Sequence, residues 1–222
     1  MTTSTGPTHS GIGIDAYLSA RRAAGQPAIL DLGCGAGKVA GAFGIDRVAL
    51  PGVNLVHDLR AIPYPVPASC ADQIHLHHVL EHFDDPVPIL EEVWRIARPG
   101  GRVLIRTPHY SGIYAWNDPT HRRAFSARSF DYFGENGYSY YTSARFRVGH
   151  VRLKYFMEEA LWPWPHRAWG RAVQWILDRH PTFGERFLCY WVGGIEELLV
   201  ALEAVKPCVE SATDDGGFSC SS

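Results

Sequence analysis

Short apolar runs alternate with longer stretches of helical periodicity along most of the chain. Five runs have the length of a buried strand, and they cover residues 28–32, 43–46, 54–58, 72–77 and 102–106. Apolar residues recur at helical spacing over Ile14–Ala24, Pro86–Ala97 and Ser126–Gly134. Strands that alternate with helices are typical of a mostly parallel sheet covered by helices. The pattern therefore predicts an α/β fold.

The last third of the chain adds two strands and a helical region. Polar and apolar residues alternate over Phe146–Phe156, as in a strand with one exposed face, and Glu197–Val205 is the last predicted strand. Between them, residues 163–188 are rich in tryptophan and have a helical pattern. We expect the tryptophans to pack one helix onto the sheet, with a dimer surface as the alternative. They are Trp162, Trp164, Trp169 and Trp175.

Length and composition fit one globular domain. The chain has 222 residues, of which 46% are hydrophobic and 20% are charged, enough to bury a full core. We expect a single domain over residues 13–206, with an aromatic-rich insertion at about 109–141 that could cover a substrate as a lid. Residues 1–12 are predicted to be a flexible tail and residues 207–222 a disordered one.

Charge, hydropathy and cysteine content exclude several classes of protein. A net charge of −2 gives no general attraction to nucleic acid or to an anionic membrane. No apolar run approaches the ~20 residues of a membrane span, and the N-terminus does not have the pattern of a secretory signal. The five cysteines form no CxxC pair, which argues against a zinc site built on thiolates. We therefore expect a cytoplasmic monomer or homodimer.

The strongest chemical signal is a glycine-rich turn at the end of the first strand. The run Ile29–Gly37 reads ILDLGCGAG, an apolar strand that leads into three alternating glycines. Glycines there allow positive φ and a close approach of backbone N–H groups to a ligand. The next strand ends at Asp46, where a carboxylate can accept hydrogen bonds from the ribose hydroxyls of a nucleoside. A tight turn that packs against a helix would also account for the glycines alone.

Together with four further segments, this array resembles the class I S-adenosylmethionine-dependent methyltransferases, and more closely a small-molecule group with an HVLEH run. The segments are HVLEH at residues 78–82, RPGG at 98–101, DPTH at 118–121 and SFDYF at 129–133. The resemblance implies a Rossmann-like fold, with a mostly parallel seven-stranded sheet whose last strand is antiparallel. It also implies S-adenosyl-L-methionine as the cofactor.

One departure from the pattern lies between the first two strands. Asp46 follows Gly33 by only 13 positions, whereas a dinucleotide fold places its ribose carboxylate about 20 residues after the glycines. Residues 38–42 are too few for a long crossover helix, so we predict an abbreviated connection. This argues against a dinucleotide, because a pyrophosphate is bound at the N-terminus of a proper helix.

The resemblance assigns cofactor contacts to the ends of the first four strands. Asp31 would bind the methionine ammonium, Asp46 the ribose hydroxyls and Asp58 the adenine amino group. The other expected contacts are Gly33, Cys34, Gly35 and Gly37 through the backbone of the turn, Lys38 as a source of positive charge, Arg47 beside the adenine, Leu59 after the third strand, and His77 and His78 near the methyl-bearing sulfur. The alternative for each carboxylate is a solvated loop residue.

Histidines are the candidate catalytic groups, because several fall near the carboxyl edge of the predicted sheet, where open α/β folds bind ligands. We predict that His121, with Asp118 three positions before it, is a general base at the mouth of the pocket, and that His109 is a second candidate. A purely structural Asp–His brace is the alternative for His121. His75 and His77 alternate with apolar residues and are expected in the core. A metal held by these histidines is a further alternative, but we assign no metal ligand.

These observations point to methyl transfer to the oxygen, nitrogen or carbon of a small-molecule acceptor in specialised metabolism. RNA or protein methylation is the first alternative. The Asn-Pro-Pro-aromatic tetrad of amino-directed nucleic-acid methylases is absent, and its place reads HHVL at residues 77–80. The second alternative is a non-catalytic module that binds a nucleoside or a partner. Neither a nucleic acid nor a membrane is among the partners that we expect.

Overall fold

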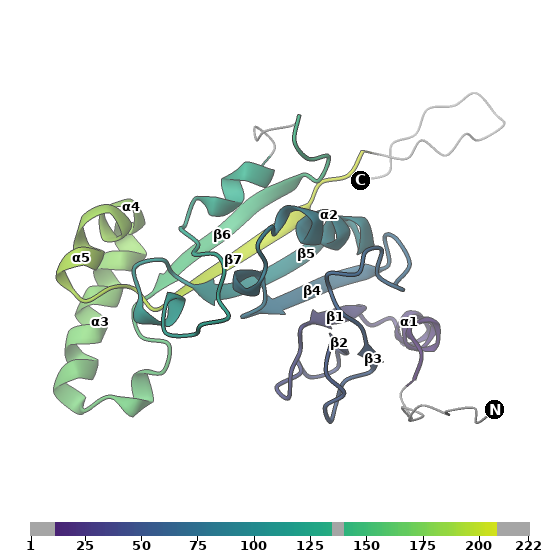
Figure 1. Cartoon of the computed structure of the whole chain (residues 1–222), viewed down its shortest axis with the longest axis horizontal. Coiled ribbons are helices and arrows are strands. Elements are labelled where there is room, and N and C mark those ends of the chain that lie inside the picture. Colours follow the sequence, from purple (N-terminus) through teal and green to yellow (C-terminus); the bar gives the residue numbers. More distant parts are fainter. Residues whose placement is uncertain (1–11, 135–139, 208–222) are drawn as a thin grey trace.

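One seven-stranded sheet forms the centre of the structure, a computed structural model that describes residues 12–134 and 140–207. Its strands are β1 (Ile29–Leu32), β2 (Phe43–Asp46), β3 (Leu55–Val56), β4 (Ala71–His77), β5 (Ala97–Pro108), β6 (Phe146–Lys154) and β7 (Glu197–Ala204). Their order is β3-β2-β1-β4-β5-β7-β6 (Figure 1). Strands β1 to β5 pair in parallel, and β7 is antiparallel to β5 and β6. The predicted fold class is confirmed.

The helices are short and unevenly distributed around this sheet. The α-helices are α1 (Ile14–Ala23), α2 (Val87–Ile96), α3 (Trp164–Arg179), α4 (Pro181–Phe183) and α5 (Cys189–Trp191). Single 3₁₀ turns are η1 (Leu80–His82), η2 (Ile113–Ala115), η3 (Ser129–Phe133) and η4 (Glu159–Leu161), and η5 (Gly184–Leu188) is a π-helical turn. Helices α3, α4 and α5 form a lobe beyond one end of the sheet (Figure 1).

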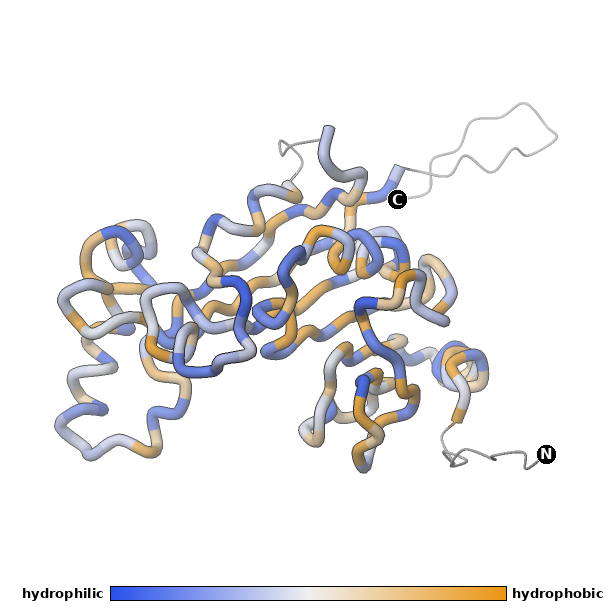
Figure 2. Tube along the Cα trace, in the orientation of Figure 1, coloured by the Kyte–Doolittle hydropathy of each residue, from blue (hydrophilic) through white to orange (hydrophobic). Residues whose placement is uncertain are grey.

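The core lies between one face of the sheet and α2. Ile74 of β4 and Ile105 of β5 point to this face and are buried, as are Leu90 and Val93 of α2. Along β6 and β7, buried and more exposed positions alternate, and the hydropathy of the chain trace alternates with them (Figure 2). Each large apolar side chain buried in this way contributes about 1.5–3 kcal/mol, so this face holds the sheet together.

The three connections before β4, at residues 33–42, 47–54 and 57–70, contain no helix. The predicted abbreviation of the first crossover is therefore confirmed, and the next two are abbreviated as well. Since parallel strands are usually joined by a helix that satisfies its own backbone, side chains must satisfy these connections. Val39 N donates to Asp31 Oδ2 at 2.8 Å. Lys38 Nζ and Gly44 N donate to Asn54 Oδ1 at 2.8 and 2.9 Å.

Helix α1 is anchored to the first two strands through Tyr17. The hydroxyl of Tyr17 accepts a hydrogen bond from Ile29 N at 3.0 Å and lies within 3.0 Å of the carbonyl oxygens of Ile29 and Gly41. Its ring packs against Phe43 at a centroid distance of 5.4 Å. The helix predicted at this position is confirmed, and its anchor also holds the loop that replaces the first crossover helix.

The strand predicted at residues 54–58 is reduced to the two residues of β3, and two further predicted elements differ in the structure. The predicted helix Ser126–Gly134 is only a 3₁₀ turn, η3, because burial of its two phenylalanines fixes a short turn against the core. Strand β5 begins at Ala97 instead of Arg102, because Ala97 pairs with Ala71 before a shift in register. The Pro-Gly-Gly run at residues 99–101 therefore lies within the strand as an irregular segment.

The tryptophans do not pack a helix onto the sheet, contrary to expectation. Trp164, Trp169 and Trp175 are 79%, 54% and 60% exposed, and α3 instead buries Val173 and Leu177. The aliphatic positions of the helix face the sheet, and the indole rings face solvent. Although these rings are exposed, no helix in the described ranges is long and apolar enough to cross a bilayer.

A buried carboxylate joins four strands at the carboxyl edge of the parallel strands. Glu197, the first residue of β7, is fully buried. Its Oε1 accepts hydrogen bonds from His78 Nε2, just after β4, at 3.1 Å and from Arg106 Nη2 of β5 at 2.6 Å. Its Oε2 accepts from Lys154 Nζ of β6 at 3.2 Å. Burial opposes the charge, but the bonds from His78 and Arg106 prevail and lower the pKa of Glu197 to about 2.

We predict that Glu197→Gln destabilises the chain much more than Glu203→Gln on the same strand. The first change removes the charge that neutralises three cations, each about a third exposed, and costs about 2–4 kcal/mol. Glu203 pairs with Arg147 at the surface, where the side chains are 45% and 59% exposed and a pair contributes less than about 1 kcal/mol. Urea unfolding measures both free energies, and equal losses would contradict the anchoring role of Glu197.

Candidate functional site

A cavity of about 390 Å³ opens at the carboxyl edge of the sheet, at the ends of β1 and β2 and beside η1. Open α/β folds bind their ligands at this edge, and the volume lies within the range of small-molecule sites. The cavity is lined by Gly33, Asp46, Arg47, Asp58, Leu59, Arg60, His78, Val79, His82, Phe83, Thr120 and Arg122. It is the candidate functional site.

The glycine turn after β1 forms one wall of the cavity. Gly33 has φ +69°, and a Cβ added there would lie 2.6 Å from Val79 Cγ2. Both the backbone conformation and the packing therefore require glycine at this position. Gly35 has φ +52°, but a Cβ there would meet nothing within 4 Å. Only the conformation favours glycine at position 35.

Acidic side chains at the ends of β2 and β3 face the cavity. Asp46 Oδ2 accepts a hydrogen bond from Gly35 N at 2.8 Å, and Oδ1 accepts one from Val48 N at 2.9 Å. A carboxylate oxygen has two lone pairs, so each oxygen keeps one for a ligand hydroxyl. Asp58 Oδ1 accepts from Arg60 N at 2.9 Å. Two acceptors, each oriented by the backbone, thus line the same cavity.

His78, directly after β4, lies between two buried carboxylates. Its φ of +55° is rare for a residue with a side chain. Its Nε2 lies 3.1 Å from Glu197 Oε1, and its Nδ1 lies 3.3 Å from Glu81 Oε1. Glu197 first and Glu81 second raise the pKa of His78 to about 9. The ring is therefore charged at neutral pH. The left-handed backbone of His78 also places the next residue, Val79, against the glycine turn.

A further wall combines η1 with the segment 117–123, far along the sequence. Arg122 N donates to the carbonyl oxygen of Glu81 at 2.7 Å, which joins the two backbones. The ring of His82 packs edge-on against that of His121 at a centroid distance of 4.8 Å. Thr120 Oγ1 lies 3.0 Å from His82 Nδ1. These contacts fix the two segments side by side.

Half of the predicted cofactor contacts line this cavity. They are Gly33, Asp46, Arg47, Asp58, Leu59 and His78. The others are Asp31, Cys34, Gly35, Gly37, Lys38 and His77, which do not line it. Asp31 is 2% exposed and holds the backbone of Val39, and Lys38 is bonded to Asn54. The ligand contacts expected of these two remain predictions.

Cys34 and His77 have environments that suit structural roles. Burial raises the pKa of the Cys34 thiol to about 11, so it stays protonated, and its sulfur would lie 2.7 Å from a Cβ on Gly44. The ring of His77 turns to the neighbouring His75, with 3.2 Å between Nε2 and Nδ1, and burial lowers the pKa of His77 to about 4. The side chain of His77 thus packs on the sheet, away from the cavity wall.

The predicted catalytic residues fall in two places. His121 Nε2 lies 3.8 Å from Asp118 Oδ2 in the segment 117–123, but neither residue is among those that line the cavity. His109 is fully buried: its Nε2 donates to Glu185 Oε1 at 3.1 Å, and its Nδ1 accepts from Ser111 Oγ at 2.9 Å. With both ring nitrogens engaged, His109 joins the end of β5 to the lobe of α3 to α5, which favours a structural role.

Several lining residues were not predicted from the sequence. They are Arg60, Val79, Phe83 and Thr120. Arg60 lies over the Phe83 ring at 5.1 Å and belongs to the same strand-end turn as Asp58, so extending the strand-end rule by two positions would have found it. Val79 and Thr120 lie within the HVLEH and DPTH segments, but only the contact between these distant segments shows that they line the cavity.

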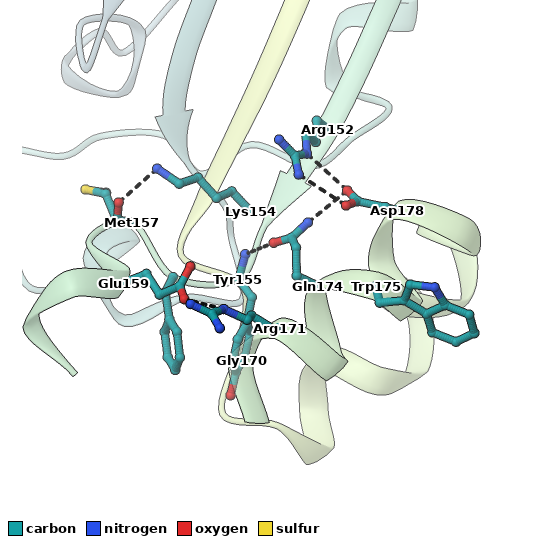
Figure 3. Close-up of a pocket in the computed structure, with 11 residues that line it drawn as sticks. Arg152, Lys154, Tyr155, Met157, Glu159, Gly170, Arg171, Gln174, Trp175 and Asp178 are labelled. Atoms are coloured by element: carbon teal, nitrogen blue, oxygen red, sulfur yellow. Dashed lines mark hydrogen bonds and ion pairs between the residues drawn. The ribbon is translucent and has the colours of Figure 1, made fainter. Parts of the chain in front are cut away.

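A larger cavity of about 540 Å³ lies between β6 and α3 (Figure 3). Its charged side chains pair with one another: Arg152 with Asp178 at 3.0 Å and Arg171 with Glu159 at 2.9 Å. Strand β6 is an edge strand of the sheet and is separated from β1, which precedes the glycine turn, by β4, β5 and β7. Since its polar groups are already paired, this cavity is a weaker candidate than the one at the carboxyl edge.

Comparisons with known proteins identify the domain. The family model for a methyltransferase domain matches residues 15–178, and no curated protein matches the chain. Among solved structures, the YcgJ protein of Bacillus subtilis is 15% identical, with 87% of this chain and 99% of that chain covered and a TM-score of 0.51. A Haloferax volcanii complex of the Trm112 methyltransferase activator with a methyltransferase gives 16% identity, coverage of 86% and 90%, and a TM-score of 0.50. At these identities the likeness concerns the fold.

We predict that Gly33→Ala destabilises the chain by about 2–4 kcal/mol, through left-handed strain and the contact with Val79. Val79→Ala removes the contact, so the double variant should be more stable than additivity predicts by about 1 kcal/mol. Gly35→Ala is the control, because it carries the strain without the contact and should not couple to Val79→Ala. Urea unfolding of the variants measures the coupling, and additive losses at position 33 would contradict the packing described.

Proposed function

The chain belongs to the methyltransferase-domain family, and on this premise we propose that it transfers a methyl group from S-adenosylmethionine to a small-molecule acceptor. The observation that carries the proposal is the position of Asp46, which ends β2 beside the glycine turn and lines the cavity at the carboxyl edge. When bound, S-adenosylmethionine supplies a methyl group on a positively charged sulfur. The residues of the chain bind and orient the two reactants.

The nucleoside side of the cavity suits this cofactor. Asp46 is held by two backbone N–H groups and keeps lone pairs for the ribose hydroxyls. Gly33 has no side chain, so the ligand can approach its backbone closely. Asp58 and Leu59 follow the next strand and supply an acceptor and an apolar surface for the adenine. Because these groups are fixed before the ligand binds, little ordering opposes binding.

The wall formed by η1 and the segment 117–123 is the acceptor side in this proposal. Arg60 and Arg122 bring guanidinium groups to the cavity, and Thr120 and His82 add a hydroxyl and an imidazole. Such donors suit an acceptor with carboxylate or hydroxyl oxygens. The volume of about 390 Å³ lies within the range of small-molecule sites. The chain contributes chiefly by positioning.

We predict that Asp46→Ala weakens the binding of S-adenosylmethionine at least about tenfold, because each charge-assisted hydrogen bond to the ribose is worth about 1.5–3 kcal/mol. Isothermal titration calorimetry measures the affinity. Since Asp46 also braces the glycine turn, the melting temperature of the variant shows whether the fold is retained.

Asp131→Ala is the matched control for Asp46→Ala. Asp131 pairs with Arg128 at the surface, is 46% exposed and does not line the cavity. Its removal should leave the affinity for S-adenosylmethionine within about twofold of the native value. Equal affinities of the two variants would place the ribose site elsewhere, and a native chain that binds no S-adenosylmethionine would refute the proposed function.

A further inference from the structure

Glu81, His82 and His121 come together beside the cavity, although His121 is distant from the other two in sequence. Each offers one ligand atom, and the three atoms lie within 4.8 Å of one another. Glu81 and His82 belong to η1, and the hydrogen bond from Arg122 N to the carbonyl oxygen of Glu81 holds the other segment against them. The cluster is thus fixed by the backbone, and the hydrogen bonds around it show which atoms are free.

The Nε2 atom of His82 carries a lone pair. Thr120 Oγ1 donates its only proton to Asp118 Oδ1 at 2.7 Å. The hydroxyl must therefore accept the hydrogen bond that joins it to His82 Nδ1 at 3.0 Å. Because Nδ1 of His82 carries the proton, Nε2 of the neutral ring is an acceptor.

The same reasoning applies to His121. Its Nδ1 lies 3.3 Å from the carbonyl oxygen of Ala115, which can only accept, so Nδ1 carries the proton and Nε2 has the lone pair. Nε2 lies 3.8 Å from Asp118 Oδ2, too far for a hydrogen bond, so it has no hydrogen-bond donor there. Metal-binding histidines typically donate their other N–H to a carbonyl or carboxylate in this way.

Glu81 contributes a buried oxygen without a hydrogen bond. The residue is 1% exposed, and its Oε2 accepts from Thr107 Oγ1 at 3.3 Å. Its Oε1 is buried and has no hydrogen-bond partner among the described residues, although the charged ring of His78 lies 3.3 Å away as an ion pair. A buried oxygen is fully satisfied only when its lone pairs are engaged, and coordination to a metal ion would do this.

We propose that Glu81, His82 and His121 bind a divalent transition-metal ion such as Zn²⁺ at the wall of the cavity. Two imidazole nitrogens and one carboxylate are a ligand set that such ions prefer and that Mg²⁺ does not. Metal–ligand bonds of about 2.0–2.2 Å require the three ligand atoms to move closer together than their present separations of up to 4.8 Å. Three protein ligands leave at least one position open, as in catalytic sites.

This site deepens the proposed function and rests on it for the nature of the ligand. His82 and Thr120 line the cavity on the proposed acceptor side. An ion there binds a hydroxyl or carboxylate oxygen of the acceptor and lowers the pKa of a bound hydroxyl. His121 is then a metal ligand instead of a general base, and Asp118 and Thr120 are positioning residues that set the free nitrogen of His82.

The test uses the untagged full-length chain after removal of bound metal with a chelator. Calorimetric titration with Zn²⁺ and visible absorption with Co²⁺ should each give one equivalent, and Mg²⁺ should not bind tightly. His82→Ala and His121→Ala should each weaken Zn²⁺ binding by about a hundredfold or more. This exceeds the loss expected when a residue that only hydrogen-bonds to a metal ligand is removed. His150→Ala removes an exposed histidine of β6 and should leave the affinity within about twofold.

Thr120→Val keeps the test decisive if a histidine variant does not fold. It removes the exposed hydroxyl that fixes the tautomer of His82 and should weaken Zn²⁺ binding about tenfold with an unchanged melting temperature without metal. A native chain that binds no stoichiometric Zn²⁺, or variants that all retain it, would overturn the site. A separate titration with S-adenosylmethionine distinguishes the two proposals. A chain that binds S-adenosylmethionine but not Zn²⁺ refutes only the metal site. A chain that binds Zn²⁺ but not S-adenosylmethionine refutes only the proposed function.

Discussion

Backbone groups in short connections between parallel strands must find partners, and the candidate site follows from this constraint. A crossover helix satisfies its own N–H groups, but residues 33–42 and 47–54 contain no helix. Side chains at the strand ends take over: Asp31 accepts from Val39, and Asp46 accepts from Gly35 and Val48. The carboxylate that faces the cavity is therefore also a structural element of the turn. Binding and folding are coupled at Asp46, since the bonds that shape the turn also orient the carboxylate.

The antiparallel end of the sheet is linked to the glycine turn through one buried carboxylate. Glu197 holds His78, whose left-handed backbone directs Val79 against the bare Cα of Gly33. A non-glycine residue keeps such a conformation only where its surroundings fix it. Here a hydrogen bond from His78 N to the carbonyl oxygen of Arg106, at 2.8 Å, and the pairing with Glu197 do so. The shape of the cavity at the end of β1 thus depends on a charge on β7.

The sequence pattern was sufficient for the sheet and for one wall of the site, because these depend on local signals. Apolar runs mark the strands, and Gly33 and Asp46 occupy fixed places at strand ends. Long-range packing was not predictable. Tryptophans suggest burial, yet Trp164 is exposed because the aliphatic face of α3 packs inward. His109 was a catalytic candidate because it is a histidine near the carboxyl edge of the sheet. Its partner Glu185 lies on the lobe of α3 to α5, and no local sequence pattern predicts where that lobe packs.

The segment 117–123 has no regular secondary structure of its own between η2 and η3, yet its polar groups are fixed by a connected network. Asp118 Oδ1 accepts from both the backbone N–H and the hydroxyl of Thr120, at 2.8 and 2.7 Å. Because the hydroxyl donates to Asp118, it can only accept a hydrogen bond from Nδ1 of His82. Such a network is rigid when every member is satisfied, so one aspartate determines which nitrogen of His82 carries the proton. The residue types at this wall therefore do not determine its chemistry alone. The hydrogen-bond network also matters, because it leaves Nε2 of His82 available to a ligand.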